Sequence, residues 1–522
     1  MQDVLIDGRW RPAAASDTFR SFDPTAGRDG DEVWPVSGWG DVDAALAAAT
    51  AAAAGLGQLP DAARGAFLEA YAARLEADRD GLVAVAHAET GLAVTPRLRE
   101  AEFPRMLDQL RQAAAAARAG TWRMPMLDTA RNIRSAAFGL GPVVVFPPAN
   151  FPLAYGSLTG GDFAAAIAGG NPVIAKAHPG CPGVSYRAAH AAVAAVRDTG
   201  LPPATVQLLH GVDPADGLRL VADSRVGATA FTGGEQAGRG LFAAASAAGK
   251  VIWVEMGSIN PVVILPGALA ERAAAIAAEL VASVTGSAGQ FCTKPGLVFF
   301  VADETGRAFA ADVAERMAAI GPQVLLSPGG RTRLERSLAA LGAAGARTIV
   351  AGGGRDAAAA CSRAPTLLEI DAASFLARPD AFLVEAFGNT TLLVGCVGVP
   401  ELVRAAAQAR GSLAASLYAA RDGRDDALWE PVAEVLVARA GRIVENRMPT
   451  GLAVTPPMQH GGPWPSAAPP FFSAVGLPFS ILRFARRICY DGWTESRLPE
   501  CLRDQPPPGR PWRFIDHEWV RR

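Results

Sequence analysis

The sequence is poor in charge and lacks the usual cysteine and histidine patterns. Charged residues make up 19% of the 522 residues and the formal net charge is -2, so nothing predicts a nucleic acid or an anionic membrane as a partner. The six cysteines form no C-x-x-C pair, and no cluster of histidines accompanies them. These absences argue against a zinc site and against a disulfide framework, and we expect no metal.

Long uninterrupted apolar runs are also missing. Two uncharged stretches, 135–161 and 448–482, are each broken by Pro and Gly, so neither could keep the backbone hydrogen bonds of a membrane-spanning helix. We interpret both as buried strands and active-site loops. Residues 1–7 have neither the basic nor the apolar region of a secretory signal, so we expect the cytoplasm, where thiols stay reduced.

Short apolar runs alternate with helical patterns in the middle of the chain. The expected strands are 143–146, 172–176, 206–209, 228–231 and 251–255, and the expected helices are 162–168, 184–197 and 235–248. This alternation predicts an α/β fold with a parallel sheet covered on both faces. Such folds bind nucleotides at the carboxyl ends of their strands. The length predicts two or three domains.

The flanking segments are less regular. Residues 1–30 predict a short hairpin at the edge of a domain, and 131–137 a strand projecting from the main body. Residues 42–80 predict two surface helices, and 83–119 a helical pattern interrupted near Gly91. Residues 505–509 predict an extended arm.

Cys292 lies in a turn between two predicted buried elements. A helix from about 273 to 288 ends at Gly289, and a strand follows at 296–301. Flanking glycines would let a ligand approach the backbone, so the thiol and its own N–H suit a nucleophile that also stabilises an oxyanion. The alternative is a small apolar residue that fills a loop.

Two other residues could serve that thiol. Asn150 follows a buried strand in a proline-bracketed loop, where its amide could donate to an oxyanion; alternatively it satisfies a turn. Glu255 ends the fifth strand in an apolar context, which would raise its pKa towards that of a general base. Alternatively, Glu255 pairs with a buried Lys or Arg.

Cofactor-binding features are weaker. After the strand at 228–231 the turn carries Gly233 and Gly234 in a G-x-x-x-x-G pattern at a helix start, which suits a pyrophosphate but is not the usual dinucleotide motif. Lys176 ends a strand, where its cation could reach a ribose or phosphate oxygen; a solvated strand-end lysine is the alternative.

Together these segments resemble the NAD(P)-dependent aldehyde dehydrogenase superfamily. The matching pieces, in the family's order, are Asn150-Phe151-Pro152, Asn171-Pro172-Val173-Ile174-Ala175-Lys176, Phe231-Thr232-Gly233-Gly234, Glu255-Met256-Gly257, Gly289-Gln290-Phe291-Cys292 and Glu385-Ala386-Phe387-Gly388. The resemblance implies a Rossmann-like cofactor domain (1–121 and 139–256), an α/β catalytic domain (257–455), and a small β oligomerisation element with a C-terminal arm (122–138 and 478–522). It also implies a homodimer or homotetramer.

The resemblance assigns roles to individual residues. Cys292 would be the nucleophile, Asn150 the oxyanion donor and Glu255 the base. The residues implied at the cofactor are Lys176, His178, Gly233, Gly234, Glu385 and Phe387; Lys176 and Glu385 would hold the two riboses, and Phe387 would lie beside the nicotinamide. An aldehyde would pass through a cysteine thiohemiacetal and thioester to a carboxylic acid.

A closer resemblance is to the branch of α-ketoglutarate semialdehyde (2,5-dioxopentanoate) dehydrogenases and NADP-dependent fatty aldehyde dehydrogenases. Its marks include Lys176-Ala177-His178-Pro179, Ser258-Ile259-Asn260-Pro261, His460-Gly461-Gly462-Pro463 and Arg487-Ile488-Cys489-Tyr490. Ala149 and Lys294 depart from the branch, which usually has a small polar residue and Asn there. This branch implies oxidation of 2,5-dioxopentanoate to 2-oxoglutarate.

Cofactor preference and substrate stay open at this point. Pro179 stands where NAD-preferring relatives often carry Glu, so NADP should be accepted as well as NAD, and a preference for NADP is a further hypothesis. Lys294 or a nearby Arg could bind a substrate carboxylate. Phe151, Phe291 and the pair 471–472 could instead line a tunnel for a medium- or long-chain aldehyde.

Two other classes of protein are alternatives. A CoA-acylating dehydrogenase would use the same cysteine but needs no water-activating base, so Glu255 argues against it. A non-catalytic nucleotide-binding relative is disfavoured by the intact set of Asn150, Glu255 and Cys292.

Overall fold

The computed structural model describes residues 1–352, 361–505 and 512–521. Its largest sheet has eight strands in the order β2-β1-β11-β10-β9-β13-β14-β24. The five central strands are parallel, and they are β11 (Val206–Leu209), β10 (Val173–Lys176), β9 (Val143–Phe146), β13 (Ala228–Thr232) and β14 (Val251–Glu255). All five predicted strands, and their parallel arrangement, are therefore confirmed.

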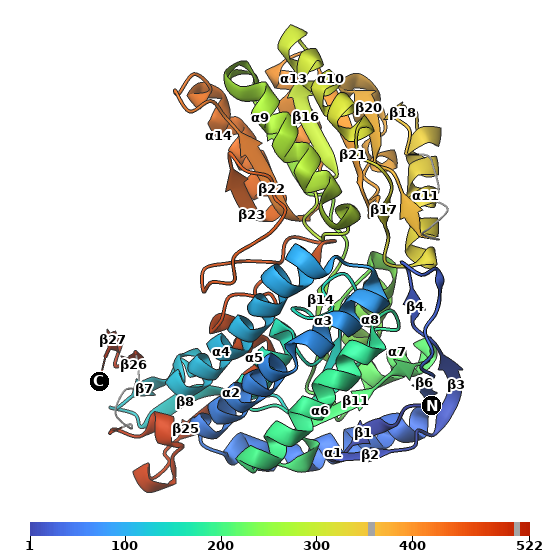
Figure 1. Cartoon of the computed structure of the whole chain (residues 1–522). Coiled ribbons are helices and arrows are strands. Elements are labelled where there is room, and N and C mark those ends of the chain that lie inside the picture. The colour runs from blue at the N-terminus through green and yellow to red at the C-terminus, as the bar shows by residue number, and fades with distance from the viewer. Residues whose placement is uncertain (353–360, 506–511, 522) are drawn as a thin grey trace.

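Helices bury both faces of this sheet (Figure 1). Val143 and Val145 of β9 belong to one apolar core, and Val144 and Phe146 to the other, because successive side chains of a strand point to opposite faces. The helices of this part are α1 (Trp39–Gln58), α2 (Asp61–Ala77), α3 (Arg79–Thr90), α4 (Phe103–Ala119), α5 (Gly161–Ala168), α6 (Pro182–Thr199), α7 (Pro214–Ala222) and α8 (Glu235–Ala247).

Two segments at the N-terminus can be compared with their predictions. The predicted hairpin is β1 (Val4–Ile6) with β2 (Arg9–Arg11), at the edge of the large sheet. The prediction of two surface helices is incomplete, because the inner face of α2 carries Phe67 and Tyr71 fully buried in the core. The alanine-rich composition of this segment gave no sign of such deep burial.

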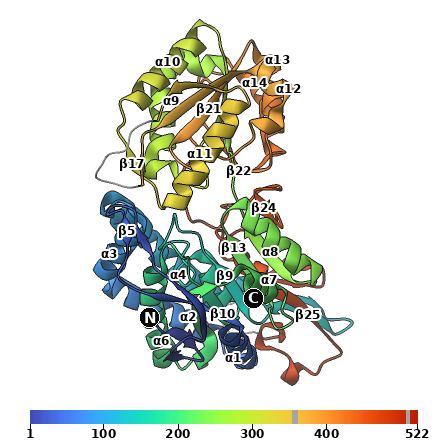
Figure 2. The same ribbon diagram turned by 90° about the vertical axis from the view of Figure 1, so that its right-hand side faces the viewer.

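A seven-stranded sheet forms a second lobe, seen at the top of Figures 1 and 2. Its order is β18 (Arg347–Val350), β20 (Thr366–Asp371), β21 (Thr390–Cys396), β16 (Leu297–Val301), β15 (Pro261–Ile264), β22 (Ser412–Tyr418) and β23 (Ala440–Glu445). Its helices are α9 (Pro266–Thr285), α10 (Glu304–Ala318), α11 (Pro328–Ala343), α12 (Ala372–Ala377), α13 (Val399–Ala406) and α14 (Asp426–Val437). Apolar cores lie on both of its faces.

A five-stranded sheet projects from the body at the lower left of Figure 1. Its strands are β25 (Ala485–Asp491), β8 (Ile133–Gly139), β7 (Met126–Asp128), β26 (Arg513–Ile515) and β27 (Glu518–Val520). The strand predicted at 131–137 is thus confirmed as β8. Residues 506–509 of the predicted arm lie outside the described residues. The predicted domain boundaries stay a prediction.

One short strand links distant parts of the chain. β24 (Ala467–Ala468) pairs antiparallel with the end of β14, so that Ala467 lies opposite Glu255. The uncharged stretch 448–482 thereby reaches the carboxyl edge of the large sheet. Among the described residues no single helix is long and apolar enough to cross a membrane. Only α1 and α2 taken together reach the required length and apolar composition, and they are bent by 116° to each other.

Candidate active site

The Cys292 loop follows α9 through a tight turn in the left-handed region. The φ angles of Ser287, Ala288 and Gly289 are 49°, 55° and 68°. A side chain on Gly289 would meet the carbonyl oxygen of Gly388 at 2.2 Å, so only glycine fits there. This turn determines where the following residues, Gln290 to Cys292, enter the site.

Replacing Gly289 with alanine should therefore inactivate and destabilise the protein. The left-handed conformation costs about 1–2 kcal/mol with a side chain, and the clash with Gly388 costs about 1–3 kcal/mol more. Thermal unfolding and aldehyde-dependent NAD(P)H formation would measure both effects. Gly342→Ala is the control, because a side chain there, at the exposed end of α11, meets nothing within 4 Å. A fully active Gly289→Ala protein would contradict this account.

Asn260 supports the Cys292 loop through hydrogen bonds to its backbone. Its Nδ2 donates to the carbonyl oxygens of Cys292 at 2.9 Å and Lys294 at 3.0 Å, while its Oδ1 accepts from the Ala414 N–H at 3.2 Å. Asn260 is fully buried, so losing its amide would leave these carbonyls without donors. In the sequence it was visible only as part of a family motif.

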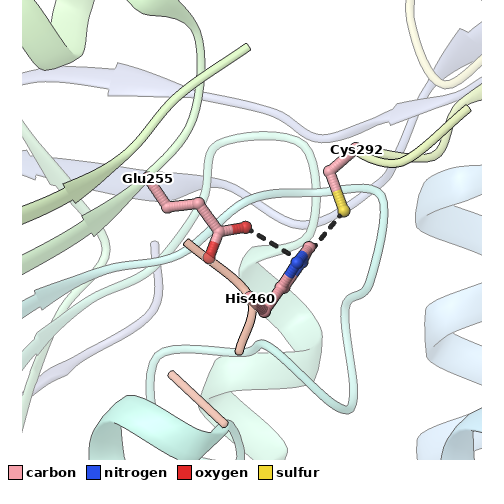
Figure 3. Close-up of side chains that lie close together, drawn as sticks. All are labelled: Glu255, Cys292 and His460. Atoms are coloured by element: carbon pink, nitrogen blue, oxygen red, sulfur yellow. Dashed lines mark hydrogen bonds and ion pairs between the residues drawn. The ribbon is translucent and has the colours of Figure 1, made fainter. Parts of the chain in front are cut away.

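The predicted thiol and base meet around a histidine (Figure 3). His460 Nε2 lies 3.2 Å from Cys292 Sγ and 3.1 Å from Glu255 Oε1. Glu255 ends β14, and His460 comes from the stretch tied to that strand by β24. His460 was not among the predicted site residues; its signal was that it is the sole histidine of the uncharged stretch 448–482.

Asn150 contacts the Cys292 loop. It follows β9, and its Nδ2 donates to the Gln290 carbonyl, two residues before Cys292, at 3.0 Å. Arg97 Nη2 fixes the Asn150 carbonyl at 2.9 Å. A side-chain amide has two N–H groups, so the contact with Gln290 leaves one to donate elsewhere. The structure therefore brings Cys292 and Glu255 together and places the predicted Asn150 against the loop that carries the thiol.

Burial governs the electrostatics of this cluster. Desolvation, followed by the charge of Asp162, raises the pKa of Glu255 to about 8. Desolvation, followed by the charge of Glu255, raises the pKa of the Cys292 thiol to about 12. Desolvation lowers the pKa of His460 to about 3, so the imidazole is neutral and a weak base. The predicted desolvation of Glu255 is confirmed.

An aromatic wall lies beside the cluster. The ring of Phe151 is 5.5 Å from that of Tyr155 and 5.6 Å from that of Phe291, and Tyr155 is 6.0 Å from the His460 ring. The predicted substrate residues Phe151 and Phe291 therefore lie together near the thiol. Of the pair 471–472, Phe471 is exposed and Phe472 packs near Trp253.

Lys294 is directed elsewhere. Its buried ammonium donates to the carbonyl oxygens of Ala386 at 2.9 Å and Thr390 at 2.5 Å, in the segment that carries Glu385. Desolvation lowers its pKa to about 8, against the opposing effect of Glu385. This placement does not favour the predicted contact with a substrate carboxylate, because the ammonium already has main-chain acceptors.

The predicted cofactor residues occupy two places. Lys176 ends β10 half-buried, and among the described residues it has no ion-pair partner; desolvation lowers its pKa to about 8. His178 Nδ1 accepts the Gly180 N–H at 2.9 Å. Gly234 caps α8 with open space around it, and Gly233 donates to the Glu255 carbonyl.

The second place lies next to Glu255. Glu385 Oε1 accepts the Ser258 N–H at 3.1 Å, and its carboxylate occupies the space that a side chain on Gly257 would fill. Phe387 follows, half-buried. A free helix N-terminus, a strand-end cation and a carboxylate at the carboxyl edge of a parallel sheet fit a dinucleotide.

The same cluster has the composition of a metal site, although we predicted none. Ligand atoms of Glu255, Cys292 and His460 lie within 4.8 Å of one another. Thioester chemistry needs the sulfur free to bond to carbon, so we interpret the cluster as catalytic.

Fold and site together place a thiol, an imidazole and a carboxylate beside a parallel sheet that can hold a nucleotide, and comparison with known proteins gives the family. The chain belongs to the aldehyde dehydrogenase family, whose model matches residues 10–467. It is an NAD(P)-dependent aldehyde dehydrogenase, which confirms the family and fold expected from the sequence.

Two relatives match almost end to end. Alpha-ketoglutaric semialdehyde dehydrogenase 2 of Azospirillum brasilense is 39% identical, over 96% of this chain and 97% of its own. Alpha-ketoglutaric semialdehyde dehydrogenase of Acinetobacter baylyi is 31% identical, over 96% of each. Lactaldehyde dehydrogenase from Escherichia coli shares the fold, with a TM-score of 0.80 at 20% identity over 94% of this chain and 98% of its own.

Proposed function

We propose that the enzyme oxidises 2,5-dioxopentanoate to 2-oxoglutarate. The convergence of Cys292, His460 and Glu255, with Asn150 against the thiol loop, supports aldehyde oxidation by this chain. The names of the two relatives support this particular substrate.

The residues divide the reaction into two half-reactions. The Cys292 thiol loses its proton to water and Sγ bonds to the aldehyde carbon, while the carbonyl electron pair moves to oxygen. His460 Nε2, 3.2 Å from Sγ, can donate a hydrogen bond to the sulfur. The resulting oxyanion accepts hydrogen bonds from Asn150 Nδ2 and the Cys292 N–H. A nicotinamide cofactor, when bound, would accept the hydride that the tetrahedral carbon loses as it becomes a thioester on Cys292. Glu255 then removes a proton from water as its oxygen attacks the thioester, and the sulfur leaves.

An aldehyde panel tests the substrate. We expect the highest kcat/KM for 2,5-dioxopentanoate, with a free carboxylic acid as product whether or not CoA is present. A higher value for long-chain aldehydes would favour the fatty aldehyde alternative. A CoA thioester as product would identify an acylating enzyme, and no turnover of any aldehyde would indicate a nucleotide-binding relative.

We also propose that NADP is accepted and preferred. Two features support this. Pro179 carries no carboxylate that would repel a 2′-phosphate, and the cation of Lys176 at the strand end would attract one. Initial rates measured with NAD and with NADP test this preference. A much higher kcat/KM with NAD would contradict the proposal.

His460→Phe tests the imidazole beside the thiol. Phenylalanine keeps a ring but removes the nitrogen that lies 3.2 Å from Cys292 Sγ, so the reactive sulfur loses a hydrogen bond and acylation should fall by about 10- to 10²-fold. The single-turnover burst of NAD(P)H measures acylation. His190→Phe, at a histidine stacked on Trp10, is the control. An unchanged burst rate in His460→Phe would contradict this role.

Quaternary structure and location complete the proposal. We infer a homodimer or homotetramer in the cytoplasm, assembled through the five-stranded sheet, with the domain boundaries expected from the sequence. β25 and β27 are the edge strands of that sheet, and Trp493, just after β25, and Trp519, in β27, are half exposed. Light scattering on the full chain would give the mass, and a monomer would contradict the assembly.

A further inference from the structure

Two arginines stack on the aromatic wall, and they differ in their partners. Arg97 lies over the Phe151 ring, with its Cζ 4.3 Å from the centroid, and it is ion-paired with Glu102. Arg105 lies 5.6 Å from the centroid of the same ring. Within residues 1–352, 361–505 and 512–521, Arg105 has no acidic partner.

Arg105 belongs to α4 and faces the catalytic cluster through Tyr155. Its Cζ is 5.0 Å from the Tyr155 centroid, and Nη2 donates to the Tyr155 hydroxyl at 2.9 Å. Tyr155 in turn is 6.0 Å from His460. The positive charge of Arg105 acts on Cys292, Glu255 and His460 alike.

The hydrogen bonding of Arg105 is incomplete. Nε is buried and has no partner in the described part of the chain. A buried N–H without an acceptor is costly, and a guanidinium offers five donors in a plane that matches a carboxylate. An acceptor that arrives with the ligand would complete this set.

We propose that Arg105 binds the carboxylate of the substrate and thereby makes the enzyme selective for aldehydes that carry an acid group a few carbons from the aldehyde. This inference deepens the proposed function. Arg105 takes the role predicted for Lys294, whose ammonium donates to main-chain carbonyls. The aromatic wall packs against the carbon chain between the two ends of the substrate.

The test compares charged and neutral aldehydes of equal length. Arg105→Met keeps the apolar stem and removes the charge, and Arg105→Lys restores a cation without the planar donor set. The control is Arg111→Met on the same helix, an arginine that pairs with Glu76 at the surface. The substrates are 2,5-dioxopentanoate with pentanal, and 4-oxobutanoate with butanal.

Arg105→Met should lower kcat/KM for the acid aldehydes on the order of 10²-fold, mainly through KM, because a hydrogen-bonded charge pair is lost. The neutral aldehydes lose the effect of the Arg105 charge on Cys292 and Glu255 but no carboxylate contact, so their kcat/KM should fall by a factor at least about tenfold smaller. Arg105→Lys should recover part of the loss on the acid aldehydes. Activity on pentanal also shows that the variant is folded.

Three outcomes would overturn the inference. One is an equal loss on charged and neutral aldehydes, which would mean that Arg105 acts through the thiol or Tyr155. The others are no loss at all, and a wild-type enzyme with no preference for acid aldehydes. A wild-type enzyme that prefers 4-oxobutanoate to 2,5-dioxopentanoate, and loses that preference in Arg105→Met, would overturn the proposed substrate and leave Arg105 in its role.

Discussion

Glu255→Gln is expected to stop the reaction at the thioester on Cys292. Glutamine keeps the size of the side chain but cannot take a proton from water, so deacylation should fall by about 10²–10⁴-fold while the first burst of NAD(P)H persists. Mass spectrometry of the protein quenched during turnover should show the acyl adduct on Cys292. No accumulated adduct would count against Glu255 as the base.

The pH dependence gives a second measure of the same residue. Burial raises the pKa of Glu255 to about 8, and only the carboxylate can act as a base. Deacylation by the wild type should therefore increase as the pH rises through about 8 and level off above it. Glu255→Gln should lose this dependence.

Asn150→Ala is expected to slow acylation and little else. The oxyanion would keep the Cys292 N–H but lose the side-chain donor, at a cost of about 3 kcal/mol, or roughly 10²–10³-fold in rate. Asn150 also donates to the Gln290 carbonyl, so thermal unfolding must be measured alongside. Single-turnover formation of NAD(P)H measures acylation.

Cofactor affinity provides the control for this variant. Asn150 lies in the loop after β9, and none of the predicted cofactor residues bonds to it. Titration of the cofactor by fluorescence should therefore give similar dissociation constants for the variant and the wild type. Equal acylation rates in the two proteins would remove Asn150 from the oxyanion site.

The parallel sheet and the meeting of Asn150 and Glu255 with the Cys292 loop could be predicted from the sequence, because each residue follows or precedes a strongly apolar strand. Parallel strands bring their carboxyl ends to one edge of the sheet, so Asn150, after β9, and Glu255, at the end of β14, were expected at the same edge, with β13 between them.

His460 could not be placed in the same way. It lies 168 residues from Cys292, in a stretch without regular helices or long strands, and only the two-residue strand β24 ties that stretch to Glu255. The direction of the Lys294 side chain could not be predicted from the sequence either, because a lysine beside a nucleophile can point into the substrate site or away from it. Arg105 lies on a helix with several other charges, and only the structure shows that it has no acidic partner among the described residues.

Because the thiol of Cys292 is protonated at rest, the enzyme should keep its activity under oxidative stress. Peroxides react with thiolates, and a sulfur whose pKa is raised to about 12 holds its proton at neutral pH. An idle molecule of this enzyme should thus resist inactivation by peroxide, and the exposed Cys489 offers oxidants an easier target.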